Sequence, residues 1–256
     1  MVYCIRGDKK PRQARKKSET GVYHVMLRGI NRQTIFEDDE DCRMFMETIA
    51  IYKKDTNTSL YGYCLMKNHI HLLVKSDMLS SFMRKLGAKY VYWYNWKYDR
   101  VGGLFQDRYK SEPVDGDGYF LTVLRYIHQN PVKAGIVETP DKYEHSSYNE
   151  YITQIKKSEI VDTDFVFKML SIEQFVDFHD ETNNDNCLEI VEIRRVNDEI
   201  AKQMIYKVSK CTNPSDFQEL EIHKRNQSIR TLKEKGLSIR QIERLTGISR
   251  GIVLKA

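Results

Sequence analysis

Alternating apolar and polar residues predict four strands in the first half of the chain. Residues 20–30 alternate and are rich in β-branched and aromatic side chains, which is typical of a strand. Residues 59–66 and 69–76 predict two further strands, joined as a hairpin by the two residues between them. A fourth strand is predicted near residues 108–114.

Helical patterns separate these strands. Residues 38–54 begin with acidic side chains, which complement the positive end of a helix, and continue with helix formers. Residues 79–100 predict a long helix, and residues 117–130 predict another that Pro131 ends. The order β-α-β-β-α-β predicts an α+β fold: a ferredoxin-like antiparallel sheet with helices on one face.

The second half of the chain is predicted to be helical and to form a separate all-α domain. The polar, acidic residues 179–186 are the best linker candidate. The last 29 residues, 228–256, predict a helix, a turn, a helix, a turn and a final short helix. The predicted parts are a basic arm (1–17), a first domain (18–152), a helical connector and linker (153–193), and a helix-turn-helix domain (194–256).

Positive charge gathers at both ends of the chain and indicates an anionic partner. The 256 residues carry a formal net charge of +5. Residues 1–17 hold seven Lys or Arg against Asp8 alone, and residues 222–256 hold nine against two Glu. Basic ends of this kind commonly bind nucleic acid.

Cysteine usage and hydropathy predict a cytoplasmic protein. The five cysteines are scattered, with no C-x-x-C pair, which argues against a disulfide framework and a zinc ribbon. The basic start of the chain has no apolar stretch that would serve as a signal, and no later run predicts a membrane span.

Two histidines in the third predicted strand are the strongest indication of chemistry. His69 and His71 lie one residue apart, so both side chains point to one face of the strand. Tyr126 and Asn130 are four residues apart and share one face of the predicted helix 117–130. If this helix lies against the histidine strand, two imidazoles and one amide oxygen form a metal site with open positions. The Tyr126 phenol beside them is the natural nucleophile toward a phosphodiester.

These residues resemble a known family. His-Ile-His matches the His-hydrophobic-His signature of the HUH single-strand endonucleases. The stretches VYHVMLRGINRQTIF, YGYCLMKNHIHLLV, FQDRYKS, RYIHQNPVKAGIV and SSYNEY together resemble the single-tyrosine (Y1) IS200-like transposases, and among them the REP-associated tyrosine transposase branch. The resemblance covers roughly residues 18–152.

The resemblance implies roles for the four side chains. In that family the two histidines bind a divalent metal, Mg²⁺ or Mn²⁺, which implies His69 and His71 as metal ligands. The family's tyrosine attacks DNA and leaves a 5′-phosphotyrosine and a free 3′-hydroxyl, which implies Tyr126 as the nucleophile. The third ligand is Gln in many IS200 members, and the matching position is Asn130, as in the REP-associated branch.

The C-terminal residues carry a second resemblance, to the DNA-binding domain of the bacterial chromosomal replication initiator, a helix-turn-helix type. Ser238 and Ser249 are predicted to cap helices, and Gly247 to form the turn between them. The basic residues predicted to contact DNA, in the arm, the first domain and this terminal domain, are Arg12, Arg28, Arg32, Arg108, Lys110 and Arg250.

Other interpretations of single residues remain open. Cys64 could complete a zinc site with the two histidines, although this leaves Tyr126 unexplained. Tyr119 is the nearest rival nucleophile. Aromatic residues of helix 79–100 could stack unpaired bases, but core packing is the commoner use of such a stripe. The remaining histidines weighed as structural residues are His24, His145, His179 and His223.

We therefore expect a metal-dependent DNA endonuclease and strand transferase that recognises single-stranded or hairpin DNA. The expected partners include no membrane, and monomer and homodimer are both open. One alternative is a domesticated protein that binds hairpin DNA with little or no cleavage. A replication nickase of a plasmid or phage is a weaker alternative, because the motifs flanking the single tyrosine are of the REP-associated type.

Overall fold

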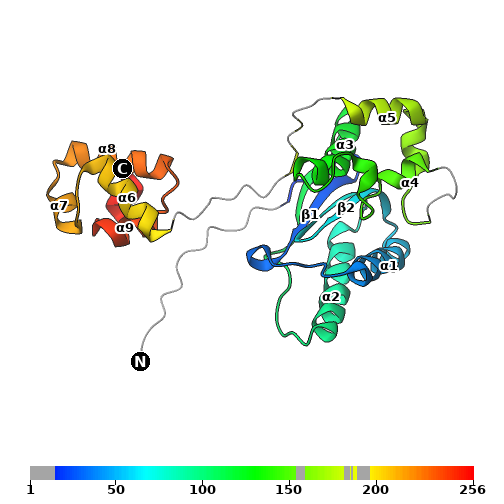
Figure 1. Ribbon diagram of the computed structural model, residues 1–256, viewed down its shortest axis with the longest axis horizontal. Helices are drawn as coiled ribbons and strands as arrows, with labels where there is room; N and C mark the ends of the chain where they lie inside the picture. Colours follow the sequence, from blue (N-terminus) through cyan, green and yellow to red (C-terminus); the bar gives the residue numbers. More distant parts are fainter. Residues whose placement is uncertain (1–14, 154–158, 182–184, 186, 189–196) are drawn as a thin grey trace. The chain divides into compact units, whose positions relative to one another are not determined.

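The computed structural model describes residues 15–153, 159–181, 185, 187–188 and 197–256. The chain divides into two compact units, the first ending at Glu189 and the second beginning at Ile190 (Figure 1). Each unit has its own hydrophobic core. No helix among these residues is both long and apolar enough to cross a membrane.

The first unit is built on a four-stranded antiparallel sheet in the order β2-β3-β1-β4. The strands are β1 (Val22–Arg28), β2 (Ser59–Met66), β3 (His69–Lys75) and β4 (Lys110–Pro113). This order and the βαββαβ sequence of elements confirm the ferredoxin-like prediction, but helices cover both faces of the sheet and not one face as predicted (Figure 1). The two central strands, β1 and β3, are almost entirely buried because helices cover both faces of the sheet.

Helices α1 (Asp39–Asp55) and α2 (Leu79–Lys97) cover one face, and α3 (Asp117–Lys133) covers the other (Figure 1). The close approach of α3 to β2 favours glycine at position 62, because an added Cβ would lie 2.5 Å from Cδ1 of Leu124 and that side chain would have to move. The prediction that Pro131 ends this helix is wrong. Pro131 lies within the last turn, and the N–H of Ala134 still donates to the carbonyl of Asn130.

The residues after α3 continue the first unit. They form η2 (Pro140–Lys142), α4 (Tyr148–Ile152), η3 (Thr163–Lys168) and α5 (Ile172–Asp180), while η1 (Ile30–Arg32) follows β1. Val161, Val166 and Phe175 are buried in the core of this unit. The described part of the predicted connector therefore packs onto the sheet domain.

The second unit is all-helical. Its elements are α6 (Asp198–Ser209), α7 (Pro214–Glu219), α8 (Ile222–Glu234), α9 (Ile239–Thr246) and α10 (Arg250–Lys255). Ser238 caps α9 by accepting from the N–H of Gln241, and Gly247 ends it in the left-handed region with φ +69°, as the sequence predicts. Ser249 occupies the N-cap position of α10 but accepts no capping hydrogen bond through its side chain.

Two aromatic residues of α2, Tyr90 and Tyr94, pack inward, whereas Tyr92 and Trp96 are exposed. Tyr90 and Tyr94 are buried, and their hydroxyls donate to the carbonyls of Ile35 and Thr34 at 2.6 and 3.2 Å. The packing interpretation of this aromatic stripe is confirmed for these two residues, because buried rings present no face to an unpaired base.

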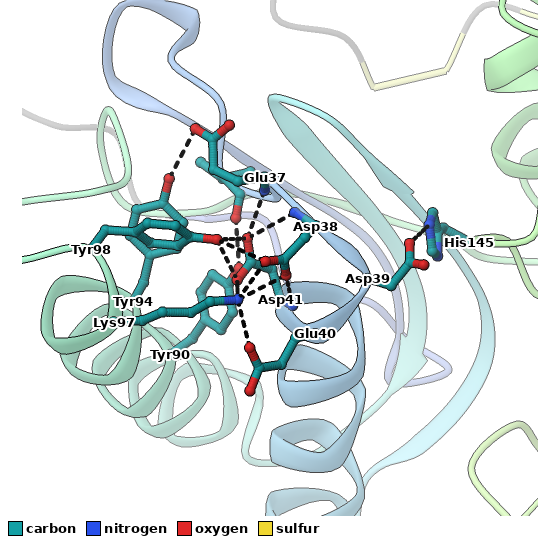
Figure 2. Close-up of polar contacts among 11 residues, drawn as sticks. Glu37, Asp38, Asp39, Glu40, Asp41, Tyr90, Tyr94, Lys97, Tyr98 and His145 are labelled. Carbon is teal, nitrogen blue, oxygen red and sulfur yellow. Dashed lines mark hydrogen bonds and ion pairs between the residues drawn. The ribbon is translucent and has the colours of Figure 1, made fainter.

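A polar cluster joins the start of α1 to the end of α2 (Figure 2). Asp38 and Asp41 form a capping box. The buried Asp41 carboxylate also accepts from Lys97 Nζ at 2.9 Å and from the Tyr98 hydroxyl at 2.9 Å. Burial alone would lower the pKa of Lys97, but hydrogen bonds to three carboxylates raise it above its ordinary value. The acidic helix start seen in the sequence thus also serves as a tertiary contact.

Replacing Asp41 by Ala is expected to lower the free energy of unfolding by about 3 kcal/mol, because it removes one half of the capping box and leaves the half-buried Lys97 ammonium with weaker partners. Asp39→Ala is the matched control. The Asp39 side chain is 75% exposed, and its ion pair with His145 lies at the surface, so its loss should cost less than about 1 kcal/mol. Urea denaturation of the two variants measures the difference, and equal values would contradict this account of the cluster.

Candidate active site

Four side chains predicted from the sequence lie together between β3 and α3. The rings of His69 and His71 have centroids 5.2 Å apart, and those of His71 and Tyr126 are 5.8 Å apart. Nε2 of His69 lies 3.4 Å from Oδ1 of Asn130. Tyr126 and His71 are buried, whereas His69 and Asn130 are half-buried and so closer to solvent.

Hydrogen bonding orients His69 toward Asn130. Nδ1 of His69 lies 2.7 Å from Oδ1 of Asn68. Because an amide oxygen only accepts, this nitrogen carries the proton, and the neutral ring then has its lone pair at Nε2. That lone pair then faces Oδ1 of Asn130. An imidazole nitrogen and an amide oxygen are both suitable ligands for a divalent cation.

The donor set fits a divalent metal. Two atoms that each lie about 2.1 Å from a shared ion are about 3.0–3.4 Å apart at octahedral to tetrahedral angles, and His69 Nε2 and Asn130 Oδ1 are 3.4 Å apart. Within the described ranges, no group of three or more His, Cys, Asp or Glu side chains could hold a metal. A site here therefore depends on the amide oxygen of Asn130.

The structure does not favour the alternative in which Cys64 completes a zinc site with the two histidines. Cys64 lies opposite His71 in the pairing of β2 with β3. Burial raises the pKa of the Cys64 thiol, which disfavours the thiolate that zinc requires.

His71 is held in its neutral form by its surroundings. Burial lowers the pKa of His71 well below its ordinary value, and the nearby His24 and His69 lower it further. Nδ1 of His71 lies 2.9 Å from Nε2 of His24. Nδ1 of His24 in turn lies 3.0 Å from Oε1 of Glu112 on β4. The site thus extends across three strands.

Two cationic residues flank the same face of the sheet and helix. Arg28 pairs with His69 across β1 and β3, and residues opposite each other in an antiparallel pair point to the same face. Lys133 Nζ lies 4.8 Å from the ring centroid of Tyr126. Both positive charges favour the approach of an anionic substrate to the phenol.

A basic groove follows the edge strand β4. One cavity of about 870 Å³ is lined by Arg15, Lys16, Lys17 and Arg108 and by the first residues of α2. A second cavity of about 500 Å³ shares Arg15, Lys16 and Arg108, adds Lys110, and reaches Glu112. We call the two together the β4 groove. The guanidinium of Arg15 lies 3.7 Å from the ring centroid of Tyr109 in its wall.

The predicted DNA contacts are thus distributed over several places. Arg108 and Lys110 are exposed in the β4 groove, and Arg28 lies on the face of His69. Arg32 is exposed at the end of η1. Arg250 is exposed in the second unit. Arg12 lies outside the described residues.

Sequence reasoning missed three members of this neighbourhood: His24, Glu112 and Lys133. His24 was weighed as a structural histidine, because a lone imidazole in an apolar strand gives no indication of its neighbours. Glu112 is remote in sequence from both histidines, and only strand pairing places it opposite His24. Lys133 lies seven residues, about two helical turns, after Tyr126, so the helical period could have identified it.

The histidine of α3, His128, points away from the candidate site, as its position two residues after Tyr126 predicts. His128 lies 2.9 Å from His179 on α5 and 2.7 Å from the Ser147 hydroxyl. The rival tyrosine, Tyr119, donates to Glu112 at 3.1 Å, and burial raises its pKa. His128 lies on another face of α3. Tyr119 lies on the same face as Tyr126 but two helical turns before it, and its hydroxyl is bonded to Glu112.

The ferredoxin-like sheet places two histidines of one strand beside a tyrosine of α3. Residues 17–130 match the model of the family described as "Transposase IS200 like". This part of the chain is similar to the IS200-like transposases.

A solved structure resembles the chain over a wider span. The structure of a REP-associated tyrosine transposase bound to a REP hairpin matches with a TM-score of 0.52 and 16% sequence identity. The match covers 71% of this chain and 96% of that one. At this identity the likeness concerns the fold. No curated protein sequence matches the chain.

Proposed function

We propose that the protein is a metal-dependent single-strand DNA endonuclease and strand transferase of the REP-associated type. It cleaves DNA that carries a hairpin, through a 5′-phosphotyrosine intermediate, and it can rejoin the strand. The observation that carries the proposal is that two potential metal ligands, His69 Nε2 and Asn130 Oδ1, lie 3.4 Å apart, while the ring of His71 lies against the ring of Tyr126. This arrangement supports a metal site next to a potential nucleophile.

Each side chain has a distinct role in the proposed reaction. His69, His71 and Asn130 hold a divalent metal, Mg²⁺ or Mn²⁺, which polarises the scissile phosphate when bound. The Tyr126 oxygen forms a bond to phosphorus while the bond from phosphorus to the 3′-oxygen breaks. The phenol proton ends on the leaving 3′-oxygen, so the products are a 5′-phosphotyrosine and a 3′-hydroxyl. The reverse steps rejoin a strand, because the phosphotyrosine is itself a phosphodiester.

Lys133 supports the nucleophile. A free tyrosine has a pKa of about 10, so attack near neutral pH needs stabilisation of developing negative charge on the phenol. The Lys133 ammonium lies 4.8 Å from the Tyr126 ring centroid and supplies a positive charge at that place. Arg28, on the same sheet face as His69, is placed to contact the phosphate.

The substrate is proposed to be hairpin DNA with a single-stranded flank. The similar solved protein was bound to a REP hairpin, which supports a hairpin as the folded part. The β4 groove suits the flank, because it combines five cationic residues with the ring of Tyr109, and single strands bind to basic grooves with aromatic walls. The second unit, with Arg250 on its surface, is proposed to be a helix-turn-helix domain that adds a further DNA contact.

A covalent-adduct assay tests the proposal. The protein is incubated with Mn²⁺ and a hairpin DNA labelled on either side of the cleavage region, then separated on a denaturing gel. A protein band that carries only the label 3′ of the cut, and that is lost with EDTA, is expected. Tight hairpin binding with no adduct under any metal would instead favour the domesticated binding protein.

Neutralising the β4 groove should weaken binding to the single-stranded flank. Binding of flanked hairpins should become less dependent on salt when Arg15, Lys16 and Arg108 are replaced by Ala. The negative slope of log association constant against log salt concentration is expected to become shallower by about 2, at roughly 0.7 per lost phosphate contact. Fluorescence anisotropy across a salt series measures it. A blunt hairpin without flanks is the control substrate, and an equal loss for both substrates would place the flank elsewhere.

A further inference from the structure

The side chains behind His71 form a directional hydrogen-bonded chain. Oε1 of Glu112 lies 3.0 Å from Nδ1 of His24, and Nε2 of His24 lies 2.9 Å from Nδ1 of His71. Both imidazoles are buried, with exposed fractions of 0% and 1%. No bulk water can therefore replace either ring's partner, and each nitrogen must be donor or acceptor according to its neighbour.

The carboxylate fixes the direction of every bond in the chain. An ionised carboxylate only accepts, so Nδ1 of His24 must carry the proton that it donates to Glu112. Nε2 of the neutral His24 ring is then an acceptor, so Nδ1 of His71 must carry a proton and donate to it. The proton of His71 is thereby held at Nδ1, and its Nε2 keeps the lone pair. That nitrogen is the one turned away from His24.

Glu112 itself is held in place as an acceptor. Its Oε1 also accepts from the Tyr119 hydroxyl at 3.1 Å and from the backbone N–H of Leu188 at 2.9 Å. Burial alone would raise the pKa of Glu112, but these hydrogen bonds and the one from His24 lower it. Three donors from β1, α3 and the segment after α5 thus converge on one oxygen.

We propose that Glu112 and His24 are positioning residues that set the tautomer of His71, so that its Nε2 presents a lone pair to the metal. This inference rests on the proposed metal site. Outer partners of this kind orient a histidine ligand and increase its basicity. His69 has a separate partner in Asn68 at 2.7 Å, so each histidine of the pair has its own fixed orientation.

The tautomer can be observed directly in the metal-free protein. Nitrogen-15 NMR of the histidine side chains, with His24 and His71 assigned by single substitutions, reports which ring nitrogen carries the proton. Both rings are expected to be protonated at Nδ1 and unprotonated at Nε2. A His71 ring protonated at Nε2 would overturn the proposal, and this experiment needs no variant of Glu112 to fold.

Metal affinity gives an independent test. Glu112→Gln keeps the side chain's shape, but its amide can donate as well as accept, so the direction of the chain is no longer fixed. Titration of Mn²⁺, followed by the electron paramagnetic resonance signal of the free ion, is expected to show roughly 10–100-fold weaker binding. Glu138→Gln, at an exposed position in the same unit, is the matched control and should bind as the unchanged protein does.

The outcomes separate the two proposals. Equal Mn²⁺ affinity for the unchanged protein and Glu112→Gln would reject the positioning role and leave the proposed nuclease intact. Absence of Mn²⁺ binding by the unchanged protein would reject the metal site and this inference together. A purely structural role for His24 and Glu112 predicts a lower unfolding temperature for the variant with no change in Mn²⁺ affinity.

Discussion

The Tyr126→Phe protein is expected to form no covalent adduct with hairpin DNA, while its affinity for the same DNA stays within about twofold. The substitution removes only the oxygen that would bond to phosphorus. The ring remains, so its edge contacts with His24 and His71, at centroid distances of 5.9 and 5.8 Å, are kept. Denaturing gels report the adduct, and anisotropy reports binding.

Tyr119→Phe is the matched control for this experiment. Tyr119 lies on the same helix and also has its hydroxyl in a hydrogen bond, to Glu112, but it is two turns from Tyr126 and three turns from Asn130 along the helix. It should retain adduct formation, with at most a modest loss through Glu112. An adduct that persists in Tyr126→Phe and disappears in Tyr119→Phe would reassign the nucleophile.

Asn130→Ala is expected to reduce the rate of cleavage by about 100–1,000-fold, with hairpin binding retained. The loss of one metal ligand removes several kcal/mol of transition-state stabilisation, and about 1.4 kcal/mol corresponds to a factor of ten in rate. Asn130 is half-buried near the end of α3, so truncation should disturb the fold little. Single-turnover cleavage at saturating enzyme measures the rate.

Gln129→Ala provides the comparison. This residue carries the same amide group on the same helix, but its side chain donates to the carbonyl of His179, away from the site. It should cleave at nearly the rate of the unchanged protein. Raising the Mn²⁺ concentration should partly restore Asn130→Ala if the amide acts as a ligand. A rate that does not respond to Mn²⁺ would contradict that role.

Much of the site follows from the sequence through local geometry. Period two in the strand places His69 and His71 on one face, and period 3.6 in the helix places Tyr126 and Asn130 on another. These periods are properties of the backbone and hold wherever the elements lie. Turn and cap residues such as Ser238 and Gly247 were predictable for the same reason, because their conformations depend on neighbours in the chain.

Only the tertiary structure identified the two residues that lie behind His71, which are His24 and Glu112. His24 and Glu112 are 88 residues apart, and no periodic pattern relates them. Their contact arises because β1 pairs with both β3 and β4, and strand order is a long-range choice made by packing of the whole sheet. The continuation of α3 past Pro131 has instead a local reason, since a proline in the last turn loses only one helical hydrogen bond. The sequence by itself thus determined the four residues of the candidate site, and long-range strand pairing determined which residues lie behind them.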